Sequence, residues 1–378
     1  MVMEDLTRQG RGGWEGHDVN GRNATGSRIA AGAVCLLTAL SLASCAGKSP
    51  VHASSKAPGP LASSSRTPVS AAPGRIVFRR FLKADDTSGA LFISAADGSG
   101  ERQITTPTGT VGDDAPDWSP DGTRILFTRT ADAGTAQEQL RLFTMSADGT
   151  GITPVTPARP TGAGALAAGD NDGAFSPDGR HIACGSFHGN VVNDEIQVSE
   201  IIVMDADGRH RHPVTRSAAY SGDDGGVAWS PDGKQLVYAH SNAGASAPAG
   251  GRALFIINAD GSHRRQLTPW SLGAGGTPEW SASTNTIAFR AVDDEEAGKG
   301  NFFTIKPDGT GLAQVTHFTD TVISHKVSFS PDGRRLVFAK ETDGGKNDLF
   351  TIRVDGSDLR AVTKTPEADS APDWSPAG

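Results

Sequence analysis

The chain has 378 residues, of which only 6% are aromatic while 47 are glycine and 22 are proline. This excess of turn-forming residues indicates many short strands joined by tight turns. The formal net charge is −8 and the sequence contains no long run of lysine or arginine, which argues against nucleic acid as a partner.

An apolar stretch, IAAGAVCLLTALSLAS at 29–44, follows Arg28 near the beginning of the chain. It is short for a membrane span, and it combines a basic flank, an apolar core and small residues in the order of a secretory signal. Its end, Leu42-Ala43-Ser44-Cys45, resembles the bacterial lipobox. The resemblance implies that residues 1–44 are a signal peptide and that Cys45 becomes a lipidated N-terminus; an ordinary signal peptide is the alternative.

Residues 45–73 are expected to form the lipidated cysteine and a disordered tether. The segment is rich in Ser, Ala and Pro and shows no apolar period. Such a coil reaches roughly 30 Å. The folded part would then be exported and held at the outer face of the cytoplasmic membrane or cell envelope. Cys184 would be the one cysteine left in that part, so no intramolecular disulfide is expected.

From Gly74 onward, two phrases alternate along the chain. The first, SPDG, follows an aromatic residue and is found, with two degraded copies, at Ser119, Ser176, Ser230, Ser281, Ser330 and Ser375. The second is an apolar strand that ends in Asp-Gly, at Asp97, Asp148, Asp207, Asp260, Asp308 and Asp355. Proline followed by Asp-Gly suits a tight reversal, so each unit is predicted to hold four short strands, A to D.

Units of ~50 residues with four strands each predict an all-β fold, a six-bladed β-propeller over residues 74–378. The first unit starts at strand B, and the last residues, APDWSPAG, form a strand A. We expect this C-terminal strand to pair with residues 75–81 in the first blade, which closes the ring and removes open sheet edges. The aromatic residue before each SPDG is expected to pack between neighbouring blades.

These phrases resemble the repeats of TolB-like propellers, in which a tryptophan or phenylalanine precedes SPDG and an apolar strand ends in Asp-Gly. The resemblance covers the whole predicted domain and implies the fold. It leaves the function open, because related propellers are protein-binding modules, domains that gate serine peptidases and a few metal-dependent lyases.

The connections between strands predict where a partner would bind. The A–B and C–D turns are short and nearly constant, whereas the B–C and D–A connections vary and share one face of the disc. Variable loops gathered on one face are typical of recognition. Loops that vary because nothing depends on them are the alternative.

We therefore expect a monomeric, non-enzymatic protein-binding or scaffold module with an unidentified protein partner and no cofactor. A hydrolase is disfavoured, because the sequence has no Gly-x-Ser-x-Gly motif. A metal-dependent lyase is the alternative, since His188, His240, His317 and His325 fall on the variable face, although solvated loop histidines explain them more simply.

A candidate binding site lies six residues before each strand-A serine, at Asp113, Asp170, Asp224 and Asp369. Ser324 occupies this position in another unit, with His325 beside it. These carboxylates are predicted to ring one mouth of the central channel, where their repulsion would favour a bound cation or a basic segment of a partner. Aspartates that cap loop amides are the alternative.

Overall fold

The structure is a computed structural model. It describes residues 74–82, 89–132, 139–158, 168–189, 197–216, 222–242, 251–294, 298–319, 321–342 and 345–376. The predicted signal peptide, Cys45 and the tether lie outside the described residues.

The described residues form an all-β structure in which short strands run antiparallel in groups of four. The first groups are β24 (Asp369–Trp374), β1 (Arg75–Phe81), β2 (Gly89–Ala95) and β3 (Arg102–Gln103); β4 (Gly112–Trp118), β5 (Arg124–Ala131), β6 (Gln139–Ser146) and β7 (Thr153–Pro154); and β8 (Ala168–Phe175), β9 (His181–Gly189), β10 (Gln197–Asp205) and β11 (His212–Pro213). The next are β12 (Asp223–Trp229), β13 (Gln235–Ser241), β14 (Arg252–Asn258) and β15 (Arg265–Gln266); β16 (Ala274–Trp280), β17 (Ile287–Asp294), β18 (Lys299–Ile305) and β19 (Ala313–Gln314); and β20 (Ile323–Phe329), β21 (Arg335–Thr342), β22 (Lys346–Arg353) and β23 (Arg360–Ala361).

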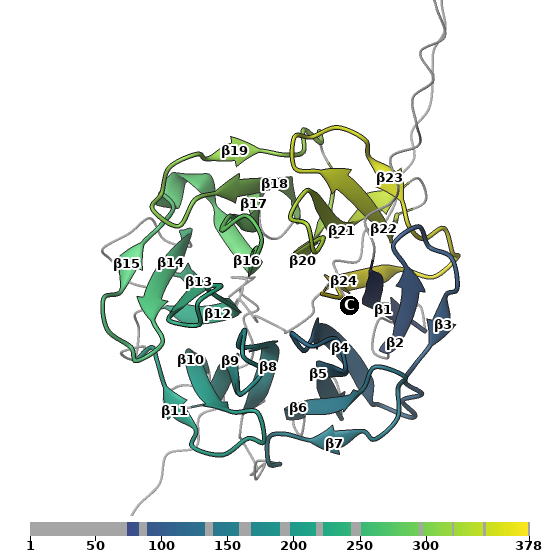
Figure 1. Cartoon of the computed structure of the whole chain (residues 1–378), viewed down its shortest axis with the longest axis horizontal. Helices are drawn as coiled ribbons and strands as arrows, with labels where there is room; N and C mark the ends of the chain where they lie inside the picture. The colour runs from purple at the N-terminus through teal and green to yellow at the C-terminus, as the bar shows by residue number, and fades with distance from the viewer. Residues whose placement is uncertain are drawn as a thin grey trace, which may run out of the picture. The chain divides into compact units, whose positions relative to one another are not determined.

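The groups lie side by side around a common centre, with β4, β8, β12, β16, β20 and β24 as the inner strands (Figure 1). Parallel bridges join β6 to β8 and β16 to β20, so that two pairs of groups merge into eight-stranded sheets. The sequence did not predict these bridges. At the first of them a Cβ on Gly169 would lie 2.2 Å from the carbonyl oxygen of Leu140, so only glycine allows this approach.

The core lies between neighbouring groups of strands. One cluster packs Val77 and Leu91, from β1 and β2, against Trp118, Ile125 and Phe127, from β4 and β5. The corresponding aromatic residues at the ends of the inner strands are also buried. Packing of these residues between neighbouring sheets, as the sequence predicted, is therefore confirmed.

The SPDG phrases form hydrogen-bonded turns. The Ser119 hydroxyl donates to Asp121 at 2.6 Å, the Thr123 amide donates to the same carboxylate at 3.0 Å, and the Arg124 amide donates to Ser119 Oγ at 2.9 Å. These bonds lower the pKa of Asp121 to about 2, with the Ser119 bond as the largest cause. The aspartates of these turns are therefore structural.

A buried threonine completes each group of strands. The backbone amide of Leu91 donates to Thr105 Oγ1 at 2.9 Å. The same bond, always to a threonine 14 residues later, recurs at Leu142 and Thr156, Ile201 and Thr215, Leu254 and Thr268, Phe302 and Thr316, and Leu349 and Thr363. The threonine hydroxyl accepts the hydrogen bond of a strand-C amide where strand D is too short to continue the ladder.

The C-terminal strand closes the series as predicted. β24 pairs antiparallel with β1, with Ile76 opposite Trp374 and Arg80 opposite Asp369. The Ser375 amide donates to the Arg75 carbonyl at 2.8 Å, and the Arg75 amide donates to Ser375 Oγ at 2.9 Å. In the part of the chain that the structure describes, no helix has both the length and the apolar character needed to cross a membrane.

Candidate functional site

The four predicted aspartates lie near the starts of inner strands and are buried. Asp113 is on β4, Asp170 on β8, Asp224 on β12 and Asp369 on β24. None is more than 3% exposed. Buried carboxylates need a cation or hydrogen-bond donors, and each of the four has one.

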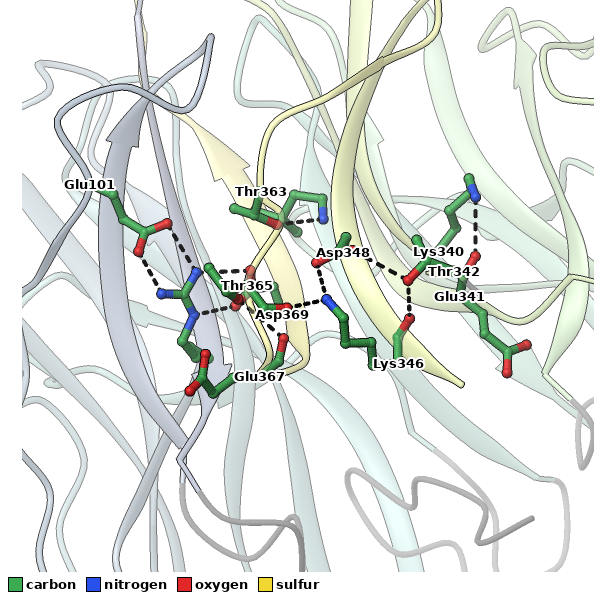
Figure 2. Close-up of polar contacts among 12 residues, drawn as sticks. Glu101, Lys340, Glu341, Thr342, Lys346, Asp348, Thr363, Thr365, Glu367 and Asp369 are labelled. Atoms are coloured by element: carbon green, nitrogen blue, oxygen red, sulfur yellow. Dashed lines mark hydrogen bonds and ion pairs between the residues drawn. The ribbon is translucent and has the colours of Figure 1, made fainter. Parts of the chain in front are cut away.

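Arginines from β5 and β1 pair with two of these aspartates. Arg129, opposite Asp113 in the register, donates from Nε at 2.6 Å and from Nη2 at 2.9 Å. Arg80 donates to Asp369 from Nε at 2.7 Å and from Nη2 at 3.0 Å, and its guanidinium also bonds to Glu101 (Figure 2). Burial acts to lower the pKa of Arg80, but its bonds to the two carboxylates outweigh this effect and raise it.

The other two aspartates are paired with residues of different kinds. Arg211 Nη1 donates to Asp170 Oδ2 at 2.7 Å, and Nη2 of the same arginine bonds to Oδ1 and to Ser186 Oγ. Asp224 lies 2.6 Å from Nδ1 of His240.

These pairs correct the expectation of four uncompensated charges. Arginines offset the negative charges of Asp113, Asp170 and Asp369, and an oxygen of Asp224 lies against the imidazole of His240. Their mutual repulsion therefore supplies little attraction for a ligand. A binding role for these residues stays a prediction.

The remaining predicted residues are divided between structural contacts and the centre of the ring. Ser324 Oγ accepts the Ala339 amide at 3.2 Å and donates to the Lys326 carbonyl at 3.1 Å. His325 is half-buried and interacts electrostatically with Asp172 of β8. Ser324 is therefore tied into its own sheet, whereas His325 faces another inner strand.

The four predicted histidines do not come together as a described metal site. His240 is bound to Asp224, His317 is exposed, and the side chain of His188 lies outside the described residues. Among the residues that the structure describes, no group of three or more His, Cys, Asp or Glu is arranged to hold a metal ion.

A second charged group on the inner strands was missed from the sequence. It consists of Asp117, Glu279, Lys326 and Asp373, from β4, β16, β20 and β24, and is called the inner-strand cluster below. Three of its members precede the aromatic residue of a repeat, in PDW, PEW and PDW. An acid at the same place in three units was the available signal.

Two carboxylates of this cluster connect neighbouring inner strands. The Trp118 amide of β4 donates to Asp373 of β24 at 2.8 Å, and the Phe175 amide of β8 donates to Asp117 of β4 at 3.0 Å. In both cases the acid before the aromatic residue of one inner strand accepts a hydrogen bond from a backbone amide of the next inner strand around the ring.

Lys326 is the cation of the cluster and is only 4% exposed. Its ammonium donates to the carbonyl of Pro116, so the side chain reaches from β20 to β4, the two inner strands in contact with β24. Burial alone would lower the pKa of Lys326, but the carboxylates of Asp373, Asp117 and Glu279 outweigh burial and raise it.

Two acids of the cluster, Asp117 and Glu279, hold protons more strongly than ordinary carboxyls do. Burial and then the charge of Asp373 raise the pKa of Asp117 to about 7, although Lys326 and the Phe175 amide oppose this. The same two causes, with Asp117 added, raise the pKa of Glu279 well above its usual range. Burial also raises the pKa of the neighbouring Asp172.

Comparison with known proteins agrees with the repeats and the closed series of sheets. The TolB beta propeller domain, PD40, matches residues 172–378, which is more than half of the chain. The chain belongs to the TolB beta propeller domain family.

Solved structures show the same fold at low sequence identity. TolB from Acinetobacter baumannii is 18% identical with a TM-score of 0.59, covering 80% of this chain and 67% of that one. The putative TolB from Agrobacterium tumefaciens is 16% identical with a TM-score of 0.53, covering 81% and 99%. Kuenenia stuttgartiensis hydrazine synthase is 12% identical with a TM-score of 0.64, covering 81% and 47%. At these identities the likeness concerns the fold alone.

A curated relative shares part of this TolB-family propeller. Dipeptidyl-peptidase 5 from Porphyromonas endodontalis is 33% identical over 117 residues, which are 31% of this chain and 16% of the peptidase. The match therefore spans about a sixth of that protein's length.

Proposed function

We propose that this chain is an exported propeller of six blades, tethered to a membrane through Cys45, which binds a protein partner without catalysing a reaction. The binding surface is the loop face, which carries the B–C and D–A connections. The observation that supports the proposal is a difference between the two faces. The connections of the loop face vary, whereas the opposite face, called the turn face, carries the short and nearly constant A–B and C–D turns.

The count of six blades rests on the antiparallel groups of strands. Each group has an inner strand, two central strands and an edge strand of two residues. The parallel bridges add only one or two residue pairs each, such as Thr277 with Lys326, between groups that are otherwise complete. Each group is accordingly one blade.

The turn face is fixed by its own hydrogen bonds. In the C–D turn after β2, the Ser99 amide and hydroxyl donate to Asp97 Oδ1 at 3.0 and 2.6 Å. Equivalent bonds from the residue two positions after the aspartate recur at Asp148, Asp207, Asp260, Asp308 and Asp355. Side chains engaged in this way leave little freedom for recognition, whereas the loop face carries no such repeated constraint in sequence.

The entry point of the chain supports the same orientation. Because β1 is the second strand of its blade, Gly74 and Arg75 lie at the turn face, next to Trp374 and Ser375. A tether that joins the domain there attaches to the turn face and leaves the loop face directed away from its attachment. A partner in solution or on another surface can then reach the loops.

The proposed binding function does not depend on the enzymatic activity of any related protein. The shared segment with Dipeptidyl-peptidase 5 covers only 16% of that protein, so the peptidase activity is not carried over to this chain. The metal-dependent lyase, the alternative from the sequence, gains no support, since His240 is engaged with Asp224 and His317 is exposed.

The test compares capture of a partner by variants of the two faces. The full chain and its variants are purified from detergent-solubilised membranes of the native cells, and the co-purified proteins are quantified. Ser271→Arg and Thr319→Arg alter exposed residues of D–A connections, whereas Lys234→Glu and Arg209→Glu alter exposed residues of the turn face. We expect the first pair to lose the partner and the second pair to retain it. The reverse pattern, or equal capture by all four, would rule out the loop face.

A further inference from the structure

In three blades a basic side chain of strand B lies against a phenylalanine of strand C and stands opposite an aspartate of strand A. Arg80 Cζ lies 4.6 Å from the centre of the Phe92 ring, and Asp369 is its partner in the register. A similar arrangement recurs for Arg129, Phe143 and Asp113, and for His240, Phe255 and Asp224. A basic group at this place therefore normally has a carboxylate within its own blade.

The blade formed by β20 to β23 keeps the basic group and lacks the acid. Lys340 Nζ lies 4.4 Å from the centre of the Phe350 ring, but Ile323 stands opposite Lys340 on strand A. The ammonium donates to the Glu341 carbonyl at 3.1 Å, and no carboxylate of the described residues forms an ion pair with it. Figure 2 shows that Glu341 turns its own carboxylate away and that Asp348 is bound to another lysine. Within the described part of the chain, Lys340 is thus a half-buried cation without a counter-charge.

A second ring, from the D–A connection that leads into this blade, also lies against Lys340. The centre of the Phe318 ring is 5.7 Å from the ammonium. Phe318 is half-buried and stands between the exposed residues His317 and Thr319, so it is accessible on the loop face. Aromatic rings attract an ammonium but carry no net charge, so an anion can still bind to Lys340.

Hydrogen bonds hold the ring and the lysine in place. The Phe318 amide donates to Asn301 Oδ1 at 2.7 Å, and Asn301 Nδ2 donates to the Phe318 carbonyl at 3.3 Å. Further along the same connection, the Val322 carbonyl accepts the amide of Glu341, the residue after Lys340, at 2.9 Å. A ring and a cation that are already fixed lose little freedom on binding, which favours recognition.

We propose that Phe318 and Lys340 form the contact point for a carboxylate of the protein partner, which presents an acidic segment to this part of the loop face. The inference rests on the proposed binding function of that face. The partner's carboxylate supplies the counter-charge that Asp369, Asp113 and Asp224 supply in the other blades, and its neighbouring carbon atoms pack on the Phe318 ring. A hydrogen bond between an ammonium and a carboxylate is stronger than one between neutral groups.

Peptide selection on the purified full chain tests the chemistry of this segment. A displayed library of random peptides is selected against the wild type and, separately, against Lys340→Glu. Peptides that are lost with Thr319→Arg, whose new side chain covers Phe318, but kept with Lys234→Glu on the turn face belong to this part of the loop face. We expect these peptides to carry Asp or Glu beside an apolar residue, and those selected on Lys340→Glu to carry Lys or Arg instead.

The affinity of one selected peptide, measured by fluorescence anisotropy, tests the contact itself. Lys340→Met should weaken its binding about fivefold or more, and replacing the acid of the peptide by the corresponding amide should abolish that difference. Lys340→Arg, which keeps the charge, should bind nearly as well as the wild type. Lys364→Met alters an exposed lysine of the same face and is the matched control, with a change of no more than about twofold. If Lys340→Met does not fold, Phe318→Leu serves instead, since the Asn301 bonds reach the backbone of that residue.

Two results would overturn the proposal, and they differ in what they say of the loop face. Loop-face peptides whose affinity is unchanged in Lys340→Met would place the contact elsewhere, as they would if a carboxylate of the chain itself held Lys340, and the proposed binding function would stand. Selected peptides that depend on neither Thr319→Arg nor Ser271→Arg would remove the loop face as the binding surface, and the proposed function with it.

Discussion

Gly98, in the turn after β2, packs against the backbone carbonyl of Val362, near the end of β23. The first blade and the last one in sequence are thereby in direct contact at the turn face. Other C–D turn glycines approach the preceding blade in the same way, as Gly149 does at Ile104, Gly208 at Val155, Gly261 at Val214 and Gly356 at Val315. The Asp-Gly pair of each repeat therefore serves both the turn and the contact between blades.

Replacing Gly98 by alanine should destabilise the domain more than replacing its neighbour Gly100. Both residues have positive φ, +83° and +64°, but a Cβ at Gly98 would lie 2.1 Å from the Val362 oxygen, whereas nothing lies within 4 Å of one at Gly100. We expect Gly100→Ala to cost about 1 kcal/mol from its backbone conformation and Gly98→Ala to cost several times more. Denaturant unfolding measures both, and equal losses would mean that the Val362 contact yields without cost.

The hydroxyl of Thr105 should matter more than its shape. Thr105→Val leaves the buried amide of Leu91 without its acceptor, at a cost of about 1–3 kcal/mol. Thr105→Ser keeps the hydroxyl and removes one methyl group, so it is the control. If valine proves as stable as threonine in thermal melts and serine does not, packing rather than the hydrogen bond explains the repeated threonine.

The buried pair of Asp113 and Arg129 should behave as a unit. Arg129→Met leaves an unpaired carboxylate that is 0% exposed, and such a loss costs about 3–5 kcal/mol. Asp113→Leu combined with Arg129→Met removes both charges and should cost less than the sum of the single changes. A double-mutant cycle on the free energy of unfolding measures the difference. Strict additivity would show that the pair contributes no coupling.

Cys45→Ala should release the protein from the membrane. Two or three acyl chains hold a protein firmly, whereas a chain without lipid has no such anchor. Fractionation of cells that express each form, together with the mass of the mature N-terminus, checks the prediction. A mutant that stays with membranes, or a wild type without lipid mass, would contradict it.

The fold was predictable from the sequence because its determinants are local and repeated. The SPDG sequence that begins at Ser119 forms a turn through the hydrogen bonds of Ser119 and Asp121. The aromatic residue before it, Trp118, indicates a side chain buried between sheets. The pairing of β24 with β1 followed from a repeat that is completed by joining the two ends of the domain.

The charged site was predictable only in part. A bulge in β4, where Ala115 adopts a φ of +47°, sets the register that puts Arg129 opposite Asp113. The presence of an alanine at this position gives no indication of a bulge in the sequence. Arg211, the partner of Asp170, comes from the other end of the same group of strands, 41 residues away, whereas Pro116, the partner of Lys326, lies 210 residues away and meets it only once the ring has closed. Long-range pairing of this kind leaves no local pattern.

Site-specific photo-crosslinking in intact cells is the measurement that tests the binding face most directly. A photoreactive amino acid is placed at exposed loop-face positions, Thr108, Ser271, Thr319 and Glu367, and at exposed turn-face positions, Ser99, Arg209, Lys234 and Thr310. We predict that one protein partner is crosslinked from several loop-face positions and from none on the turn face. Crosslinks to that partner concentrated on the turn face would contradict the account.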